Sequence, residues 1–155
     1  MEQYFNDIVE NINLENDSNI EKTIDDILNN LTHKEYESLS NVNEKKQIII
    51  DNLFEKYKYE NNNLENKNNL LEELGNFRFI ETNEVQKNDI IKYIDLKFFT
   101  HLKLSNMLCI REINDNFFSI YAGVKHISFK KTKKIFFKKI NNKDLVKMKL
   151  IEYLD

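Results

Sequence analysis

The spacing of apolar residues changes near Gly75, and this change limits which folds the chain can adopt. Before Gly75 apolar residues recur at helical spacing, as in Tyr4, Ile8 and Ile12, which indicates amphipathic helices. After Gly75, short runs rich in aromatic and β-branched residues indicate strands. The sequence therefore predicts an α+β fold. An N-terminal helical part precedes a small antiparallel β-meander or barrel-like sheet, and a C-terminal helix follows.

Four helices are expected before Gly75, and their apolar stripes place them at residues 4–12, at residues 20–31, from Thr32 onward, and at residues 44–59. Ser18 can cap the second helix. Thr32 and Glu35 have the spacing of a capping box, which marks the start of the third. The asparagine-rich residues 60–70 are expected to form a linker or polar loop, and a short turn after them ends at Gly75.

Six strands are expected after Gly75, and they cover residues 77–81, 89–97, 106–113, 116–122, 124–130 and 133–140. Short turns between the later strands favour antiparallel neighbours. Cys109 lies in the third strand, where we expect a buried and unreactive thiol. The chain then ends in a helix with Asn142 as its cap.

Charge also divides the chain at Gly75. Residues 1–75 hold 17 acidic and 7 basic residues, whereas residues 76–155 hold 9 acidic and 16 basic residues. This asymmetry suits a helical layer on a basic sheet, or a separate acidic part beside a nucleic-acid domain. We therefore expect an acidic helical region at 1–75 and a basic β-rich domain with the C-terminal helix at 76–155.

The densest basic segment is residues 128–140, which contain six lysines and two adjacent phenylalanines but no acidic residue. If it is a β-hairpin with charged ends, alternation sends the two lysines of each doublet to opposite faces. The lysines then bracket an apolar centre, as charged residues beside aggregation-prone strands do. Phe136 and Phe137 cannot face the same core, so the outward ring needs cover from a helix, a partner or a base. The C-terminal helix is the nearest cover.

The alternative is a nucleic-acid-binding element. Residues 125–149 contain ten lysines and one acidic residue, Asp144, which is enough for salt-sensitive attraction to phosphate. The candidate contacts to nucleic acid or to a partner are Lys130, Lys131, Lys133, Lys134, Phe136, Phe137, Lys138 and Lys139.

No pattern in the sequence predicts catalysis, a cofactor or a metal. His33, His101 and His126 are far apart and have no companion at ligand spacing. Two glycines do not make a glycine-rich phosphate loop. No apolar run approaches the roughly 18 residues of a membrane span, and the N-terminus does not resemble a signal peptide. We expect a soluble, intracellular, non-enzymatic protein without a cofactor.

The segment from Asn88 to Lys131, with the strand at residues 133–140, resembles small uncharacterised proteins of giant nucleocytoplasmic large DNA viruses. The likeness rests on the strand at residues 91–96, followed by a leucine-rich turn and several short strands, and it covers residues 77–140. The resemblance implies a role in the virion or its assembly, with localisation to the virion or viral factory, and it implies no activity and no binding residues.

Two functions follow as predictions. The first is a non-enzymatic structural or protein-interaction component that associates with itself or with a protein partner through the N-terminal helices. The basis is that four apolar stripes exceed what one small sheet needs as cover. The second is a nucleic-acid-associated protein that binds phosphate through residues 125–149.

Overall fold

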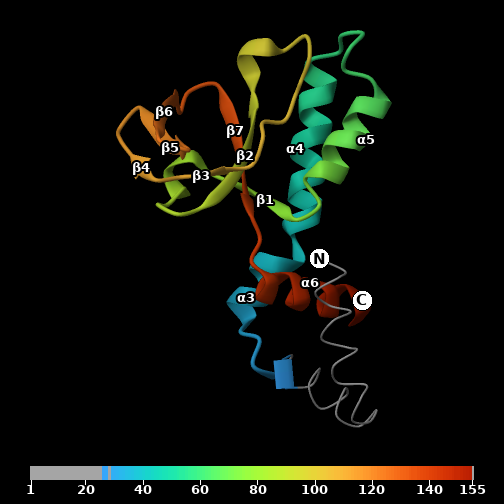
Figure 1. Cartoon of the computed structure of the whole chain (residues 1–155). Coiled ribbons are helices and arrows are strands. Elements are labelled where there is room, and N and C mark those ends of the chain that lie inside the picture. The colour runs from blue at the N-terminus through green and yellow to red at the C-terminus, as the bar shows by residue number, and fades with distance from the viewer. Residues whose placement is uncertain (1–25, 28, 155) are drawn as a thin grey trace. The chain divides into compact units, whose positions relative to one another are not determined.

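The computed structural model describes residues 26–27 and 29–154 (Figure 1). The chain forms two compact units, one of Met1–Asn43 with Ile140–Asp155 and one of Glu44–Lys139. The predicted division at Gly75 is therefore not where the two units separate. The predicted helix at 4–12, and residues 20–25 and 28 of the next one, lie outside the described residues.

In the first unit, α3 (His33–Ser40) and α6 (Asn142–Leu154) share an apolar core. Thr32 caps α3 and forms the predicted capping box with Glu35. The cap of α6 lies one residue earlier than predicted, because the Asn141 side chain accepts a hydrogen bond from the Asp144 N–H at 2.8 Å. The core contains Leu39, Val42, Ile140, Leu145, Met148 and Ile151.

The helices of the second unit are α4 (Val42–Lys56), which begins in the first unit, and α5 (Leu64–Glu73). The fourth predicted helix is confirmed. The prediction of a loop at 60–70 is wrong from Leu64 onward, because the Asn63 side chain caps α5 by accepting a hydrogen bond from the Asn66 N–H. Gly75 follows the C-cap residue Leu74, which agrees with the expected end of this helix.

Sheet A is antiparallel and has the strand order β1-β7-β2-β3. Its strands are β1 (Phe77–Ile80), β2 (Ile90–Asp95), β3 (Leu108–Cys109) and β7 (Lys134–Lys139). Short 3-10 helices, η1 (Thr82–Glu84) and η2 (Leu96–Phe98), lie before and after β2. The last strand in the sequence is thus an inner strand, and it pairs with both β1 and β2.

Sheet B has the order β4-β5-β6, from β4 (Glu112–Ile113), β5 (Phe117–Ala122) and β6 (Lys125–Lys130). The predicted strand at 106–113 is therefore divided between two sheets, and the fully buried Ile110 lies between its two parts. The α+β class is confirmed, but the strands form two antiparallel sheets that do not close into a barrel.

Strand β7 separates two apolar cores within the second unit. On one face of sheet A, Phe137 packs with α4 and α5 residues such as Ile50 and Leu70. On the other face, Phe136 packs with Phe118 of sheet B, with ring centroids 5.3 Å apart in an edge-to-face arrangement. Figure 1 shows α4 and α5 side by side, with sheet B on the opposite side of β7.

Candidate functional site

The lysine-rich segment 128–140 is not a hairpin. Its first part belongs to β6 in sheet B and its second part to β7 in sheet A, and the two strands do not pair with each other. Residues 131–133 connect them, and Lys133 has a left-handed backbone, with φ of 55°. The chain passes here from one sheet to the other, so residues 128–140 do not form the β-hairpin that the sequence predicts.

Three of the predicted contact lysines have partners inside the protein. Lys131 Nζ lies 4.8 Å from the centroid of the Phe118 ring. Lys134 Nζ is 3.8 Å from Asp95 Oδ2, and Lys138 Nζ is 3.2 Å from Asp89 Oδ1. Because these three ammonium groups already contact an aromatic ring or a carboxylate, they are less available to bind a ligand.

The other three predicted lysines, Lys130, Lys133 and Lys139, are exposed. Lys138 and Lys139 are adjacent in β7, and strand alternation places their side chains on opposite faces of sheet A, as predicted. The lysines therefore lie at several places on the second unit and make no continuous basic stripe along one strand.

Phe136 and Phe137 do not belong to any contact surface. Their exposed fractions are 1% and 0%, because β7 is covered on both of its faces. The expectation that the C-terminal helix covers the outward ring is wrong, since α4 and α5 cover Phe137 and sheet B covers Phe136. Both residues stabilise the core and are removed from the candidate site.

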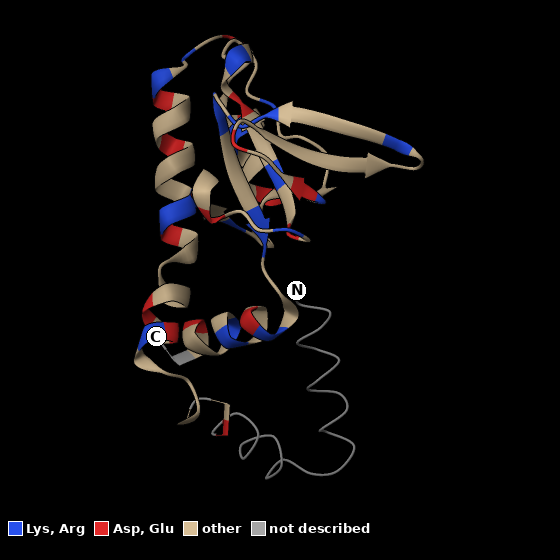
Figure 2. Ribbon diagram, turned by 90° about the vertical axis from the view of Figure 1, so that its left-hand side faces the viewer, with Lys and Arg blue, Asp and Glu red and all other residues tan. Residues whose placement is uncertain are grey.

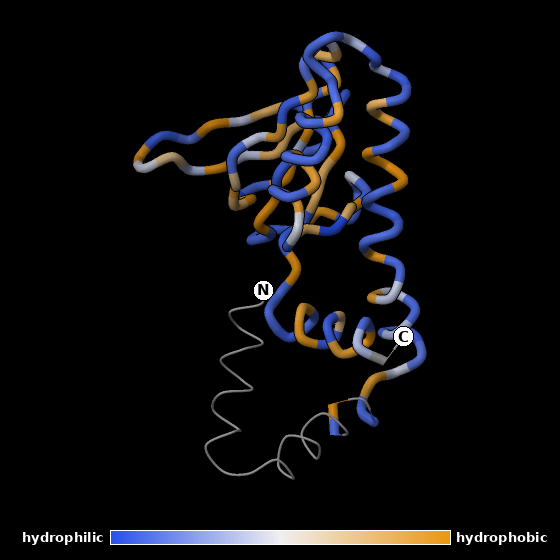
Figure 3. Tube along the Cα trace, turned by 90° about the vertical axis from the view of Figure 1, so that its right-hand side faces the viewer, coloured by the Kyte–Doolittle hydropathy of each residue, from blue (hydrophilic) through white to orange (hydrophobic). Residues whose placement is uncertain are grey.

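A surface that the sequence reading did not single out is the β5–β6 hairpin. It extends away from sheet A, and hydrophobic residues recur along it to the tip (Figures 2 and 3). Tyr121 is 53% exposed, Val124 is fully exposed and Ile127 is 43% exposed. We call this element, residues 117–130, the β5–β6 arm.

The turn of the arm explains why it is narrow and regular. Ala122 pairs with Lys125, and only Gly123 and Val124 connect them. Gly123 has φ of 66° and Val124 does not have a positive φ, which fits a type II′ turn with glycine first. Such a turn matches the twist of two antiparallel strands, so the arm continues as a ribbon to its end.

The base of the arm is anchored in the second core. Phe118 is fully buried, and the Phe129 ring stacks on Tyr93 with centroids 5.2 Å apart. On the opposite face, Ser119 and Ser128 share a hydrogen bond at 2.9 Å. The arm is therefore held at its base by packing, whereas its outer half presents apolar side chains to solvent.

Polar contacts order the outer half. His126 Nε2 lies 3.3 Å from Glu112 Oε2, and the imidazole lies against the Tyr121 ring with centroids 5.2 Å apart. These contacts tie the two strands of the arm to β4. The exposed apolar side chains are therefore presented on an ordered ribbon.

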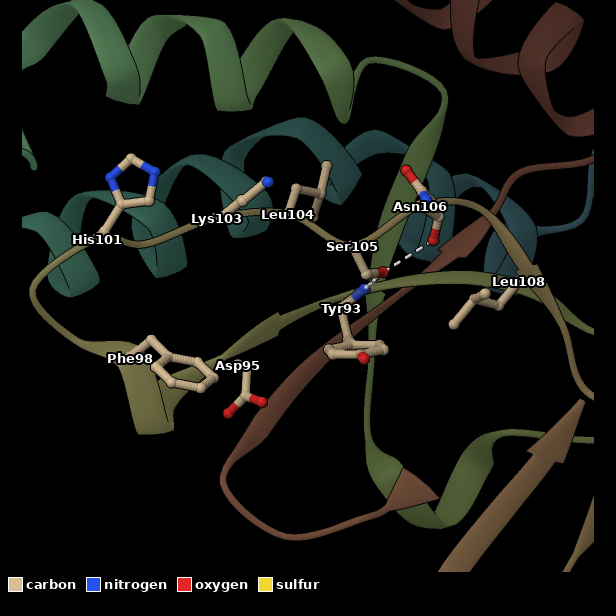
Figure 4. Close-up of a pocket in the computed structure, with 9 residues that line it drawn as sticks. All are labelled: Tyr93, Asp95, Phe98, His101, Lys103, Leu104, Ser105, Asn106 and Leu108. Carbon is tan, nitrogen blue, oxygen red and sulfur yellow. Dashed lines mark hydrogen bonds between the residues drawn. The ribbon is translucent and has the colours of Figure 1, made fainter. Parts of the chain in front are cut away.

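A cleft of about 410 Å³ lies between the end of β2 and the segment that follows η2 (Figure 4). Tyr93, Asp95 and Phe98 line one side, and Phe98 is 62% exposed. The side chains of His101 and Lys103 point away from Tyr93 and Asp95, so the main chain of that segment forms much of the other side (Figure 4).

Most polar groups in the cleft are engaged. Ser105 Oγ accepts a hydrogen bond from the Tyr93 N–H and donates one to the Asn106 carbonyl oxygen, both at 2.9 Å. Asp95 Oδ1 accepts a hydrogen bond from the Lys97 N–H at 3.0 Å. Burial, with the nearby negative charge of Asp95, raises the pKa of Tyr93, so its hydroxyl stays protonated. These lining residues present no nucleophile paired with a base.

Cys109 is not buried as predicted. It is half-buried at the end of β3, and its Sγ lies 3.9 Å from the Asn88 carbonyl oxygen, whereas the next residue, Ile110, fills the core position. Within residues 26–27 and 29–154, no group of three or more His, Cys, Asp or Glu residues is arranged to hold a metal ion. In the same part of the chain, no helix has the length and apolar character needed to cross a membrane.

Comparisons with protein-family models, with curated proteins and with solved structures find no match to this chain.

Proposed function

We propose that the protein is a non-enzymatic interaction component that binds a protein partner through the β5–β6 arm. The observation that supports this proposal is the exposure of Tyr121, Val124 and Ile127 on an ordered ribbon. Exposed apolar side chains gathered on one element are typical of interaction surfaces. The second core needs only the base of the arm, so the exposed tip does not contribute to the packing of that core.

The test is affinity purification of the tagged full-length chain from its native source. The variant carries Tyr121→Thr and Ile127→Thr in the strands and Val124→Ser in the turn, which keep residue types suited to each position while removing the apolar surface. A matched control carries Ile48→Gln and Met107→Gln, because these residues are exposed to a similar degree elsewhere (51% and 54%).

The arm variant should lose a protein that the wild type and the control both retain. Hydrogen exchange of the backbone amides of residues 117–130 should slow when the wild type or the control binds the partner, and it should not slow for the arm variant. Identical captured proteins for all three chains, with no protection of the arm, would contradict the proposal.

Association through the N-terminal helices is a separate route to the same function. Four apolar stripes predict it, and most of the first two lie outside the described residues. Its test is sedimentation of the full chain against a chain without residues 1–25. A loss of assembly on truncation supports this route, and unchanged sedimentation counts against it. A virion or assembly role, which the resemblance to giant-virus proteins implies, would use either surface.

Nucleic-acid binding is the second candidate function. It is supported by the charge of residues 116–134, which contain five lysines and no acidic residue. The deciding measurement is the salt dependence of binding to mixed-sequence DNA or RNA. It compares substitutions of the exposed Lys130 and Lys133 with substitutions of Lys131 and Lys134, which have partners within the protein.

A further inference from the structure

Strand β6 has an open edge. In sheet B it pairs with β5 on one side, and no described strand pairs with it on the other. The strand runs the length of the arm, away from sheet A (Figure 2). An open edge presents main-chain N–H and C=O groups that can pair with another extended segment.

The pairing of β5 with β6 fixes which residues present these groups. The Lys131 N–H donates to the Asn116 carbonyl oxygen at 3.0 Å, and Ala122 and Lys125 close the two-residue turn. Hydrogen-bonded pairs alternate along an antiparallel ladder, so every second residue of β6 directs its main-chain groups away from β5. These residues are His126, Ser128 and Lys130.

Charge selects among the segments that could occupy this edge. Lys125 and Lys130 lie at the two ends of β6, both are exposed, and residues 116–134 contain no acidic residue. A second copy of the arm would bring like charges together, which disfavours pairing of two arms. A strand with acidic side chains on the face of Lys130 would instead gain favourable contacts.

Building on the arm as the interaction surface, we propose that β6 accepts an acidic extended peptide of a partner protein as a fourth strand of sheet B. Apolar residues of the peptide lie beside Ile127 and Phe129, and acidic residues alternate with them on the face of Lys130. Main-chain hydrogen bonds to His126, Ser128 and Lys130 supply affinity, and the positive charge of the strand favours acidic peptides over basic ones.

The probe is a fluorescein-labelled nine-residue peptide in which Glu and Val alternate, and binding to the full chain is followed by anisotropy at low salt. Ser128→Pro removes an outward N–H without removing a β5–β6 hydrogen bond, which an edge strand tolerates. Ser128→Ala is the matched control, because it removes only the hydroxyl that bonds Ser119. We expect affinity to fall at least about tenfold for Ser128→Pro and to stay unchanged for Ser128→Ala.

Charge is tested with Lys130→Glu, because Lys130 lies on the face of β6 that receives the acidic residues, whereas Lys125 lies on the opposite face with Ile127. This variant should lose affinity for the Glu–Val peptide and gain affinity for a peptide in which Lys and Val alternate.

A third measurement changes the peptide and leaves the protein as it is. Two Glu–Val peptides are N-methylated, one at the valine amides and one at the glutamate amides. Alternate residues of a paired strand direct their N–H groups toward the neighbouring strand, so either the valine amides or the glutamate amides face β6. Only the peptide that is methylated at the amides facing β6 should lose binding.

No binding of the Glu–Val peptide at low salt overturns the proposal, and so does equal binding by both N-methylated peptides. A dimer of the full chain that Ser128→Pro abolishes would identify a second copy as the occupant and overturn it too. If the arm variant loses its native partners but Ser128→Pro keeps them, the arm remains an interaction surface. Only the proposal that the partner adds a strand to β6 then fails.

Discussion

The Nζ of Lys46 donates a hydrogen bond to the carbonyl oxygen of Leu74 at 2.8 Å and a second to that of Phe77 at 3.0 Å. Lys46 comes from α4 and is 5% exposed, and its two acceptors lie where α5 ends and β1 begins. Leu74 is the C-cap residue of α5, and a cation that reaches the C-terminal end of a helix can donate to its last carbonyl groups. Lys46 therefore joins α4 to the corner between α5 and β1.

The first prediction concerns the pH dependence of this contact. Burial lowers the pKa of Lys46 from its usual 10.5. Between the folded and unfolded pKa values the unfolded chain binds more protons, so the free energy of unfolding rises with pH. The stability difference between wild type and Lys46→Met should therefore grow in favour of wild type as pH rises toward 10.5. Urea unfolding at several pH values measures it, and a constant difference would contradict the assignment.

The second prediction concerns Asn62, which is 8% exposed. Its Nδ2 donates to the carbonyl oxygens of Tyr57 and Phe99, and its Oδ1 accepts from the Leu102 N–H. Asn62→Leu should destabilise the protein by about 2–4 kcal/mol in urea unfolding, because buried main-chain groups lose their partners. Hydrogen exchange at residues 99–102 should accelerate. The exposed neighbour substitution Asn61→Ala should stay within about 0.5 kcal/mol, and an equal cost for both would exclude a special role for Asn62.

The third prediction concerns the ion pair between Glu35 of α3 and Lys147 of α6, which are 3.2 Å apart. The hydrogen bond from Lys147, helped by that from the Thr32 N–H, lowers the pKa of Glu35 below 4.5. The stabilisation is present above pH 4.5 and is lost as pH falls through the folded pKa. Carbon-detected NMR titration should show the pKa of Glu35 rising in Lys147→Met. Lys143→Met should raise it less, and equal shifts would argue against the direct contact.

The fourth prediction separates the lysines near the start of β7. Lys130→Gln and Lys133→Gln should each change stability by no more than about 0.5 kcal/mol, because both residues are exposed. Lys131→Gln and Lys134→Gln should each cost about 0.5–1 kcal/mol, because they lose contacts with aromatic rings.

The same four variants decide the nucleic-acid hypothesis. If the lysines contact phosphate, log affinity falls linearly with log salt, and each real contact removed should reduce the slope by about 0.7–0.9. Anisotropy with mixed-sequence DNA and RNA gives this slope. An absence of binding at low salt would eliminate nucleic acid as a ligand of this segment.

The local pattern of the sequence was sufficient to locate most elements. The Thr32 capping box and the strands at 77–80, 90–95 and 134–139 follow from spacing and residue type. It did not locate the start of α5, because the capping residue Asn63 lies among many other asparagines. It also did not divide residues 106–113 between two sheets, because strand pairing depends on residues distant in the sequence.

The candidate site was harder to predict for a physical reason. Phe136 and Phe137 are consecutive and apolar, which is typical of a strand buried on both faces, but the flanking lysines suggested a surface. Lysine can bury its aliphatic stem while its charge reaches solvent or an acid, as Lys134 and Lys138 do. Conversely, Tyr121 and Ile127 have the residue types of a buried strand, and their exposure depends on how far the arm extends past sheet A.

The inner position of β7 also affects the order in which the chain can fold. Strand β1 pairs only with β7 among the described strands, although β2 and all of sheet B lie between these two strands in the sequence. Closing such a long loop costs more conformational entropy than closing a short turn, so we expect β1 and β7 to pair late in folding. Until β7 is in place, the apolar residues of α4, α5 and β1 that pack against it stay partly uncovered. The folding intermediate before this step is therefore the species most exposed to aggregation.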